Sequence, residues 1–355
     1  MIRVGFVFHK DPLQAAAGID IIRLHALTGG LLARGLGVDI IAPVDRPGQT
    51  PAGVPVYPLD HLAHARYDAL KTCYHFSLEL IGDYDGPVVS RIVRVVDDEL
   101  PERDMAWRGR LLACQETIAA RSSVVVLNNG ENEQRWLARY GKTSQASTLL
   151  IRTGCPAVIP RKGKNPYAKG EKVMLFLGSL CSARMVAMLN ALADALRDAA
   201  RIHHIGRSKL HIYDDGSTAP LSPLIVRHGE MPERETWNYV RHACIGLAIA
   251  PGPYSFDNDL SKIYGYLRGG LPVLSEERII NNELIAAMGH GQVFAYDDID
   301  DAAGRARRLL RGLPSGGGRR VMASMARAHA WERRVDQYYD LFTRLQAGAQ
   351  NACPD

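Results

Sequence analysis

The chain lacks the features that mark several common classes of protein. No apolar run approaches the 18 or more residues of a membrane span, and the start, MIRVGFVFHKD, has too short an apolar stretch for a secretory signal. The six cysteines include no Cys-x-x-Cys pair, which argues against zinc ribbons and redox dithiols. We therefore expect a cytoplasmic protein whose cysteines stay reduced.

A long basic run is also missing. The net charge is only +5, and the lysines and arginines are scattered over both halves of the chain. Nucleic acid is therefore not expected as a partner. Trp107, Arg108 and Arg110 lie on an expected helix, so a weak peripheral contact with the inner face of the membrane stays open.

Signatures of other enzyme classes are absent as well. Neither Gly-x-Ser-x-Gly nor a full Gly-x-Gly-x-x-Gly occurs, so hydrolases and dehydrogenases lack their basic motif. Gly141-Lys142-Thr143 is no phosphate-binding loop, because Trp136 stands where that motif needs a glycine. His203-His204 has no partner at metal-ligand spacing.

The pattern that is present predicts two α/β domains. At 355 residues the chain exceeds what one core usually organises, and 46% hydrophobic residues suffice for two cores. A strand at 2–8, a helix at 19–34 and a strand at 38–42 form a βαβ opening. Further apolar runs that predict strands of the same parallel sheet occur at 70–74, 88–93, 124–127 and 148–152.

A polar segment, RKGKNPYAKGEK at 161–172, has no apolar period and is typical of a linker. We place the domain boundary there, with a first domain of residues 1–162 and a second of 163–329. The pattern restarts with a strand at 173–177 and a helix at 183–200, followed by strands at 209–213, 224–227, 246–250 and 272–274. A helical tail at 318–347 follows, and we expect residues 330–347 to return to the first domain.

The most informative segment is PGPYSFDNDLSKIYGYLRGGLPVLS at 251–275. A helix that begins near Leu260 and Ser261 presents free backbone amides and the positive end of its dipole. Ser261 and Lys262 add a hydroxyl and an ammonium at that end. The arrangement predicts a diphosphate site, with a plainly capped helix that leads to a buried strand as the alternative.

SKIYGYLRGGLPV resembles the signature of the family 4 retaining glycosyltransferases, which have the GT-B fold. VMLFLGSLCSAR at 173–184, KLHIYDDGS at 209–217 and LIVRHGEMPERETWNYVRHACIGLAIAP at 224–251 resemble other stretches of the family's second domain, and TLLIRTGCP resembles its hinge-proximal turn. The resemblance implies two Rossmann-like domains facing across a cleft. It also implies transfer of a sugar from a nucleoside diphosphate sugar to a glycan, glycolipid or small-molecule acceptor, with retention and without a metal or other cofactor.

The resemblance also suggests site residues. The cations at the diphosphate are Arg184 and Lys262, and His75 is a candidate to contact the donor sugar or the acceptor. The donor site would include Gly18, Gly178, Ser179, Glu230, Met231, Asp257, Asn258, Leu260 and Ser261. Two family positions are altered, because Gly265 replaces a ribose-binding glutamate and Ser179 replaces an arginine.

Several alternatives stay open. Asp257-Asn258-Asp259 fits the Asp-x-Asp pattern that holds a divalent metal in another transferase fold, although its place before a late helix argues against that use. Arg91 and Arg94 follow a strand and could bind an anionic acceptor. UDP is expected over GDP from family frequency alone. The altered positions also allow a degenerate protein that binds nucleotide or glycan without turnover.

Overall fold

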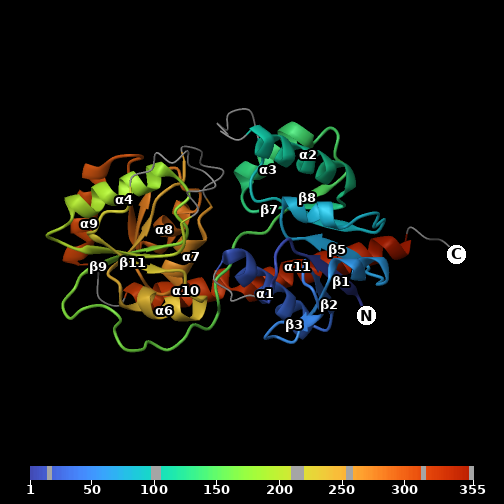
Figure 1. The fold of residues 1–355 in the computed structure, drawn as a ribbon, viewed down its shortest axis with the longest axis horizontal. Coiled ribbons are helices and arrows are strands. Elements are labelled where there is room, and N and C mark those ends of the chain that lie inside the picture. The colour runs from blue at the N-terminus through green and yellow to red at the C-terminus, as the bar shows by residue number, and fades with distance from the viewer. Residues whose placement is uncertain (14–17, 97–104, 209–219, 253–258, 313–316, 352–355) are drawn as a thin grey trace. The chain divides into compact units, whose positions relative to one another are not determined.

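The structure, a computed structural model, describes residues 1–13, 18–96, 105–208, 220–252, 259–312 and 317–351. It divides into unit 1, Met1–Thr153 with Trp331–Asp355, and unit 2, Gly154–Ala330 (Figure 1). The expected α/β class with two Rossmann-like domains is confirmed. The units divide between Thr153 and Gly154, so residues 154–162, which the sequence placed in the first domain, belong to unit 2.

Unit 1 is built on an eight-stranded sheet with the order β3-β4-β2-β1-β5-β6-β7-β8. All neighbouring strands are parallel except β3 and β4. The inner strands are short, mainly apolar and buried on both sides, as expected for a parallel sheet covered by helices, and they include the buried Lys71 and Arg91. The strands are β1 (Arg3–Val7), β2 (Gly37–Ile41), β3 (Gly48–Gln49), β4 (Pro55–Tyr57), β5 (Ala69–Thr72), β6 (Val88–Arg91), β7 (Val124–Leu127) and β8 (Ser147–Leu150).

Helices cover both faces of the unit 1 sheet. On one face α1 (Ile19–Ala33) and α11 (Trp331–Asn351) pack against each other and share a core in which Phe342 meets Phe6 edge to face. On the other face lie α2 (Met105–Arg121), α3 (Gly130–Tyr140) and two short 3₁₀ helices, η1 (Leu59–Ala63) and η2 (His75–Leu80). The last helix of the chain is therefore part of the first unit's core.

Unit 2 has a six-stranded parallel sheet with the order β11-β10-β9-β12-β13-β14. Its central strand, VMLFL, is almost wholly buried. The strands are β9 (Val173–Leu177), β10 (Arg201–Ile205), β11 (Ile225–Gly229), β12 (Ile245–Ala248), β13 (Val273–Glu276) and β14 (Gly291–Phe294).

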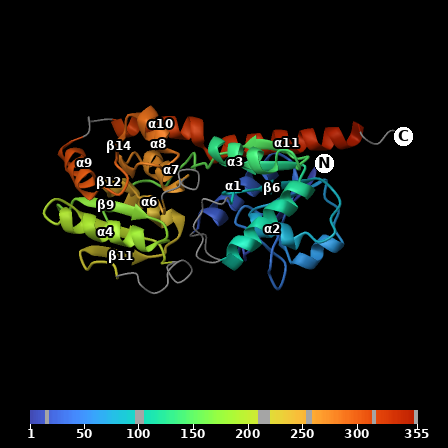
Figure 2. The same ribbon diagram turned by 90° about the horizontal axis from the view of Figure 1, so that it is seen from above.

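Two separate apolar clusters fill the two sides of this sheet, and Figure 2 shows the helices around it. One cluster lies under α4 (Ala183–Ala195) and α9 (Ile299–Arg311). The other lies under α6 (Glu233–His242), α7 (Ser261–Arg268), α8 (Asn282–Met288) and α10 (Gly317–His329). Among the described residues no helix is both long and apolar enough to cross a membrane.

Two expected elements differ from the structure. The strand after α4 is β10, which the sequence analysis did not predict, while the strand expected at 209–213 lies outside the described residues. The helical tail expected at 318–347 is two helices, α10 and α11, which are separated at Ala330. That residue forms a bridge with Cys155, and the Cys155 backbone N–H donates to His329 O, so the chain turns here to leave unit 2.

Candidate functional site

The carboxyl edge of the unit 2 sheet contains a topological switch point. The connection that follows β9 leads toward β10, whereas the connection that follows β12 leads in the opposite direction, toward β13. Neighbouring loops separate at such a point and leave room for a ligand outside the strand ends. Gly178 and Ser179 follow β9 directly, and α7 belongs to the connection after β12.

Two glycines shape the loop after β9. Gly178 has φ 108°, a conformation that other residues rarely adopt, and its N–H donates to Ile205 O over 2.9 Å. A Cβ on Gly206 would lie only 2.2 Å from Gly178 O. His204 supports the same carbonyl, since its Nε2 is 2.9 Å from it. The sequence analysis missed Gly206 because it missed β10, the strand that Gly206 follows.

Lys262 lies beside this loop. Its Nζ is 3.7 Å from the centroid of the Phe176 ring, and a Cβ on Gly178 would lie 3.6 Å from it. No carboxylate or carbonyl among the described residues accepts a hydrogen bond from this ammonium. Burial lowers the pKa of Lys262 to about 7, and the nearby Cys181 thiol opposes that shift only in part. The structure thus brings a cation without a counter-ion to the glycine loop.

The N-terminus of α7, like the Lys262 ammonium, has hydrogen-bond donors without an acceptor among the described residues. Leu260 is the N-cap residue, and no side chain caps the helix. The backbone N–H groups of Ser261 and Lys262 have no acceptor among the described residues, whereas Ile263 N–H donates to Leu260 O over 3.2 Å. Asn281, which is fully buried, holds the start of the helix by accepting from Leu260 N over 2.9 Å and donating to Leu260 O over 2.8 Å. Asp257 and Asn258 lie outside the described residues.

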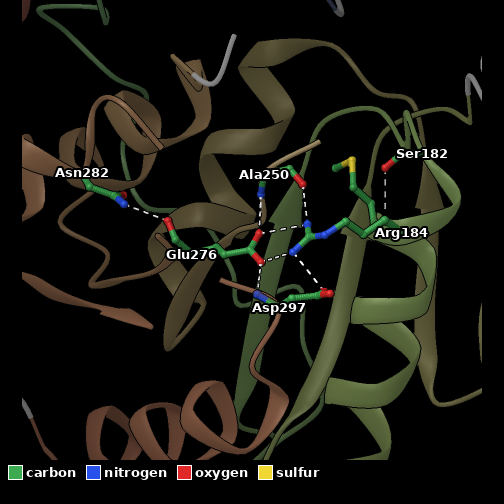
Figure 3. Close-up of polar contacts among 7 residues, drawn as sticks. Ser182, Arg184, Ala250, Glu276, Asn282 and Asp297 are labelled. Carbon is green, nitrogen blue, oxygen red and sulfur yellow. Dashed lines mark hydrogen bonds and ion pairs between the residues drawn. The ribbon is translucent and has the colours of Figure 1, made fainter. Parts of the chain in front are cut away.

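Arg184, the second expected cation, has partners of its own (Figure 3). Its guanidinium donates to both carboxylate oxygens of Glu276, and it contacts Asp297 over 3.2 Å. It also donates to Ala250 O over 2.8 Å and stacks on the Tyr296 ring. Burial opposes its charge, yet the attraction of Glu276 leaves its pKa raised.

Glu276 organises this group of residues from the end of β13. It is fully buried and accepts from the backbone N–H groups of Ala250 and Asp297, each over 2.9 Å. Asp297 has φ 63°, a left-handed conformation that aspartate tolerates better than most residues. Two carboxylates thus already balance Arg184, whose role at a diphosphate stays a prediction. The sequence analysis missed Glu276; its place after GLPVLS, at a parallel strand end, was the available signal.

The remaining predicted donor residues are spread along the same edge. Glu230 follows β11, is exposed and lies 3.9 Å from Arg207 Nε. Met231 is half-buried and packs on the core under α6 and α7. Ser179 is half-buried, and a side chain at Gly265 would meet nothing within 4 Å. Their expected contacts with base and ribose stay predictions.

His75 is part of the fold of unit 1. It is 1% exposed, with Nε2 3.4 Å from the backbone nitrogen of Val93 and Nδ1 3.4 Å from the side-chain nitrogen of Gln115. Burial, helped by the charges of Arg94 and Arg91, lowers its pKa to about 3. A neutral and packed ring orders the loop after β5, and its predicted contact with a substrate stays a prediction.

Gly18 is the N-cap residue of α1. Its carbonyl accepts from the N–H groups of Ile21 and Ile22, each over 3.1 Å, and its own φ of −97° needs no glycine. No described residue lies within 4 Å of the place that a Cβ on Gly18 would take, so the described residues leave this place open. Gly18 belongs to unit 1, whereas the other expected donor-binding residues belong to unit 2.

No group of three or more potential metal ligands is found within the part of the chain that the structure describes. The ring nitrogens of His203 have protein partners, since Nδ1 lies 2.9 Å from His228 Nε2 and Nε2 lies 3.3 Å from Glu171 Oε1. Two of the three residues of the Asp-x-Asp sequence lie outside the described residues.

The sequence matches no protein-family profile, and no curated protein matches it in sequence. Solved structures match over almost the whole chain. Sucrose-phosphate synthase from Thermosynechococcus elongatus is 15% identical with a TM-score of 0.74, and the match covers 98% of this chain and 100% of that one. HepE from Anabaena, solved in complex with UDP, is 12% identical with a TM-score of 0.70, covering 97% and 100%. Trehalose-6-phosphate synthase OtsA is 10% identical with a TM-score of 0.71, covering 96% and 99%. At such low identity the likeness concerns the fold: this chain has the GT-B fold, with two parallel-sheet α/β units.

Proposed function

We propose that the chain is a glycosyltransferase in which unit 2 binds a nucleoside diphosphate sugar and unit 1 binds the acceptor. The observation that carries the proposal is Lys262, an ammonium without a counter-ion among the described residues, beside Gly178 at the start of α7. One fold can host many functions, so the GT-B likeness supports the proposal but does not carry it.

The diphosphate fits this place for three reasons. Glycine at 178 lets a ligand approach the backbone without meeting a side chain. The uncapped amides of α7 and the helix dipole favour an anion at the helix start. Lys262 supplies a positive charge at this place. Burial disfavours its protonated form, and a bound anion would favour that form again.

These groups would act on the departing diphosphate. As the acceptor oxygen bonds to the anomeric carbon, the bond from that carbon to the diphosphate oxygen breaks, and the diphosphate leaves with the electron pair. The hydroxyl proton of the acceptor is released. Fixed donors placed where this negative charge develops lower the barrier without reorganisation. Retention and independence of metal belong to the proposal through the family resemblance, and UDP is the preferred nucleotide since HepE was solved with UDP.

A second candidate is a GT-B protein that binds a nucleotide or glycan without turnover. Two observations favour it: Gly265 leaves the ribose position without a carboxylate, and Arg184 is held by Glu276 and Asp297. Nucleotide binding at Lys262 is expected of the transferase and of the nucleotide-binding form of the second candidate, and only the transferase predicts donor consumption.

The test combines binding and turnover on the full chain. UDP, GDP, ADP and dTDP are screened by thermal shift with and without EDTA, and the common sugar conjugates of the best nucleotide are then assayed for hydrolysis and transfer. We expect Lys262→Gln to lose the nucleotide-dependent shift and Lys169→Gln, which alters an exposed lysine of the same unit, to keep it. Binding without any donor consumption would favour the second candidate. No binding of any nucleotide would refute the transferase and the nucleotide-binding form of the second candidate.

A further inference from the structure

Arg91 is a buried arginine that lacks a hydrogen-bond acceptor. It is the last residue of β6 and is 3% exposed. Its Nη1 is buried without a hydrogen-bond partner, and no described residue forms a hydrogen bond or ion pair with its guanidinium. A guanidinium carries five N–H donors, and leaving charged donors unsatisfied inside a protein is costly. A bound ligand that supplied an acceptor would offset this cost.

The neighbours of Arg91 make its surroundings more positive. Asp20, in the first turn of α1, lies 3.5 Å from Lys10 Nζ and 3.7 Å from Arg23 Nη1. Burial raises the pKa of Asp20, but the charges of Arg23, Lys10 and Arg91 outweigh it and leave that pKa lowered. The positive charges of Lys10, Arg23 and Arg91 therefore all act on Asp20.

The imidazole ring of His9, which interacts with Lys10 and Asp20, adds no positive charge. His9, which follows β1, stacks on Tyr74 with 5.0 Å between the ring centroids. Burial, with a contribution from Lys10, lowers its pKa to about 4, so it is neutral at pH 7. Its Nδ1 is buried and, like Arg91 Nη1, has no partner. A bound group at this edge could thus meet a guanidinium, an ammonium and a neutral imidazole.

The location is that of a ligand site in a parallel sheet. The connection after β1 leads to β2 and the connection after β5 leads to β6, on the other side of β1, so unit 1 has its own switch point between β1 and β5. His9 and Tyr74 belong to the loops that separate there, and α1 begins behind them with no side-chain cap. Arg91 ends the next strand, so the cations gather at the edge where ligands of such sheets bind.

We propose that unit 1 binds an oxyanion of the acceptor at Arg91, with Lys10 and the start of α1 as further contacts, so that the acceptor is a phosphate- or carboxylate-bearing sugar. The identification of the bound molecule as the acceptor rests on the proposed function, whereas the anion site itself does not depend on it. A phosphate monoester carries about −1.5 to −2 charges at pH 7 and could give the buried Arg91 guanidinium the acceptor that no described residue supplies. Neutral sugars would leave Arg91 without an acceptor.

Inorganic phosphate is the first probe, titrated by thermal shift at constant ionic strength in the presence of saturating UDP, which occupies the proposed site at Lys262. We expect the full chain to be stabilised by phosphate. Arg91→Gln should weaken phosphate binding at least tenfold and leave the shift caused by UDP unchanged. Arg66→Gln, which alters an exposed arginine of unit 1 that forms no ion pair with a described carboxylate, is the control and should bind phosphate like the parent.

A second readout separates a ligand site from a structural arginine. Because no described residue bonds to the Arg91 guanidinium, Arg91→Gln should raise or preserve the melting temperature of the ligand-free chain. Only the increase in melting temperature that phosphate causes should disappear. A structural arginine would instead lower it. Glucose 6-phosphate, glucuronate and glucose then identify the source of the anion: a shift with either anionic sugar supports the site and names its group.

Three results would overturn the inference: no stabilisation by phosphate or by either anionic sugar, an equal response to neutral glucose, or an undiminished phosphate response in Arg91→Gln. None of these three results would contradict the proposed function if UDP still stabilises the parent chain and fails to stabilise Lys262→Gln. Loss of the UDP response in the parent would refute the donor site and leave the phosphate result to stand by itself.

Discussion

Binding of UDP above neutral pH should transfer a proton from solution to Lys262. In the free chain burial lowers the pKa of this lysine to about 7, whereas a neighbouring diphosphate favours the charged form and should return the pKa toward its ordinary value near 10. From these values roughly 0.9 proton is taken up per UDP at pH 8, and roughly 0.1 at pH 6. The affinity should accordingly fall about tenfold for each pH unit above 7.

Isothermal titration calorimetry at pH 8 measures this uptake, in buffers that differ in ionisation enthalpy. The slope of binding enthalpy against ionisation enthalpy is the number of protons, and UDP contributes little because its terminal phosphate, with a pKa near 6, is already ionised. Lys262→Gln should bind about 10- to 100-fold more weakly, as expected for loss of a charged hydrogen bond, and with a slope near zero. Tight binding by the parent chain without proton uptake at pH 8 would refute the placement of the diphosphate at Lys262.

Three stability predictions follow from other residues. Glu276→Gln should lower the free energy of unfolding by about 3 kcal/mol in urea denaturation, because it leaves the Arg184 guanidinium facing one remaining carboxylate; an unchanged value would mean that the buried pair contributes nothing. Lys71→Met should stabilise the chain by about 1–4 kcal/mol, since a buried ammonium with only a thiol and two aromatic rings around it is replaced by an apolar side chain of similar size; a lower melting temperature would contradict this. Gly265→Ala should stabilise by about 0.5–1 kcal/mol, because alanine favours the helix and the new methyl meets nothing, and destabilisation in the same assay would show that the space is not free.

Buried apolar runs made most of the fold predictable. The strands at 124–127 and 173–177 were predicted with their observed bounds, since every residue in them is apolar and parallel strands are covered on both sides. β10, RIHHI, escaped prediction because two histidines interrupt its apolar pattern. The structure buries them by giving each a partner: His203 faces His228 and Glu171, and His204 faces Gly178 O. Such pairing across strands cannot be read from one strand.

The candidate site was predictable in part for the same reason. Lys262 and Gly178 belong to local patterns, a helix start and a strand end, and both lie where those patterns place them. The partners of Arg184 come from β13 and the loop after β14, far along the chain, so nothing local indicated that its charge is already balanced. Likewise, the absence of an acceptor at Arg91 is a property of the packed unit, which residue type and spacing do not show.

The placement of α11 has a consequence for the order in which the chain folds during synthesis. Unit 2 is one continuous stretch, Gly154–Ala330, so all of it is synthesised before the last helix. Unit 1 is discontinuous, and its core lacks Tyr338, Phe342 and their neighbours until Trp331–Asn351 arrives. The first half to be translated is therefore the last to be completed, and its sheet carries an uncovered apolar face in the meantime. A released chain truncated after Ala330 should expose that face to chaperones although it contains all of unit 2.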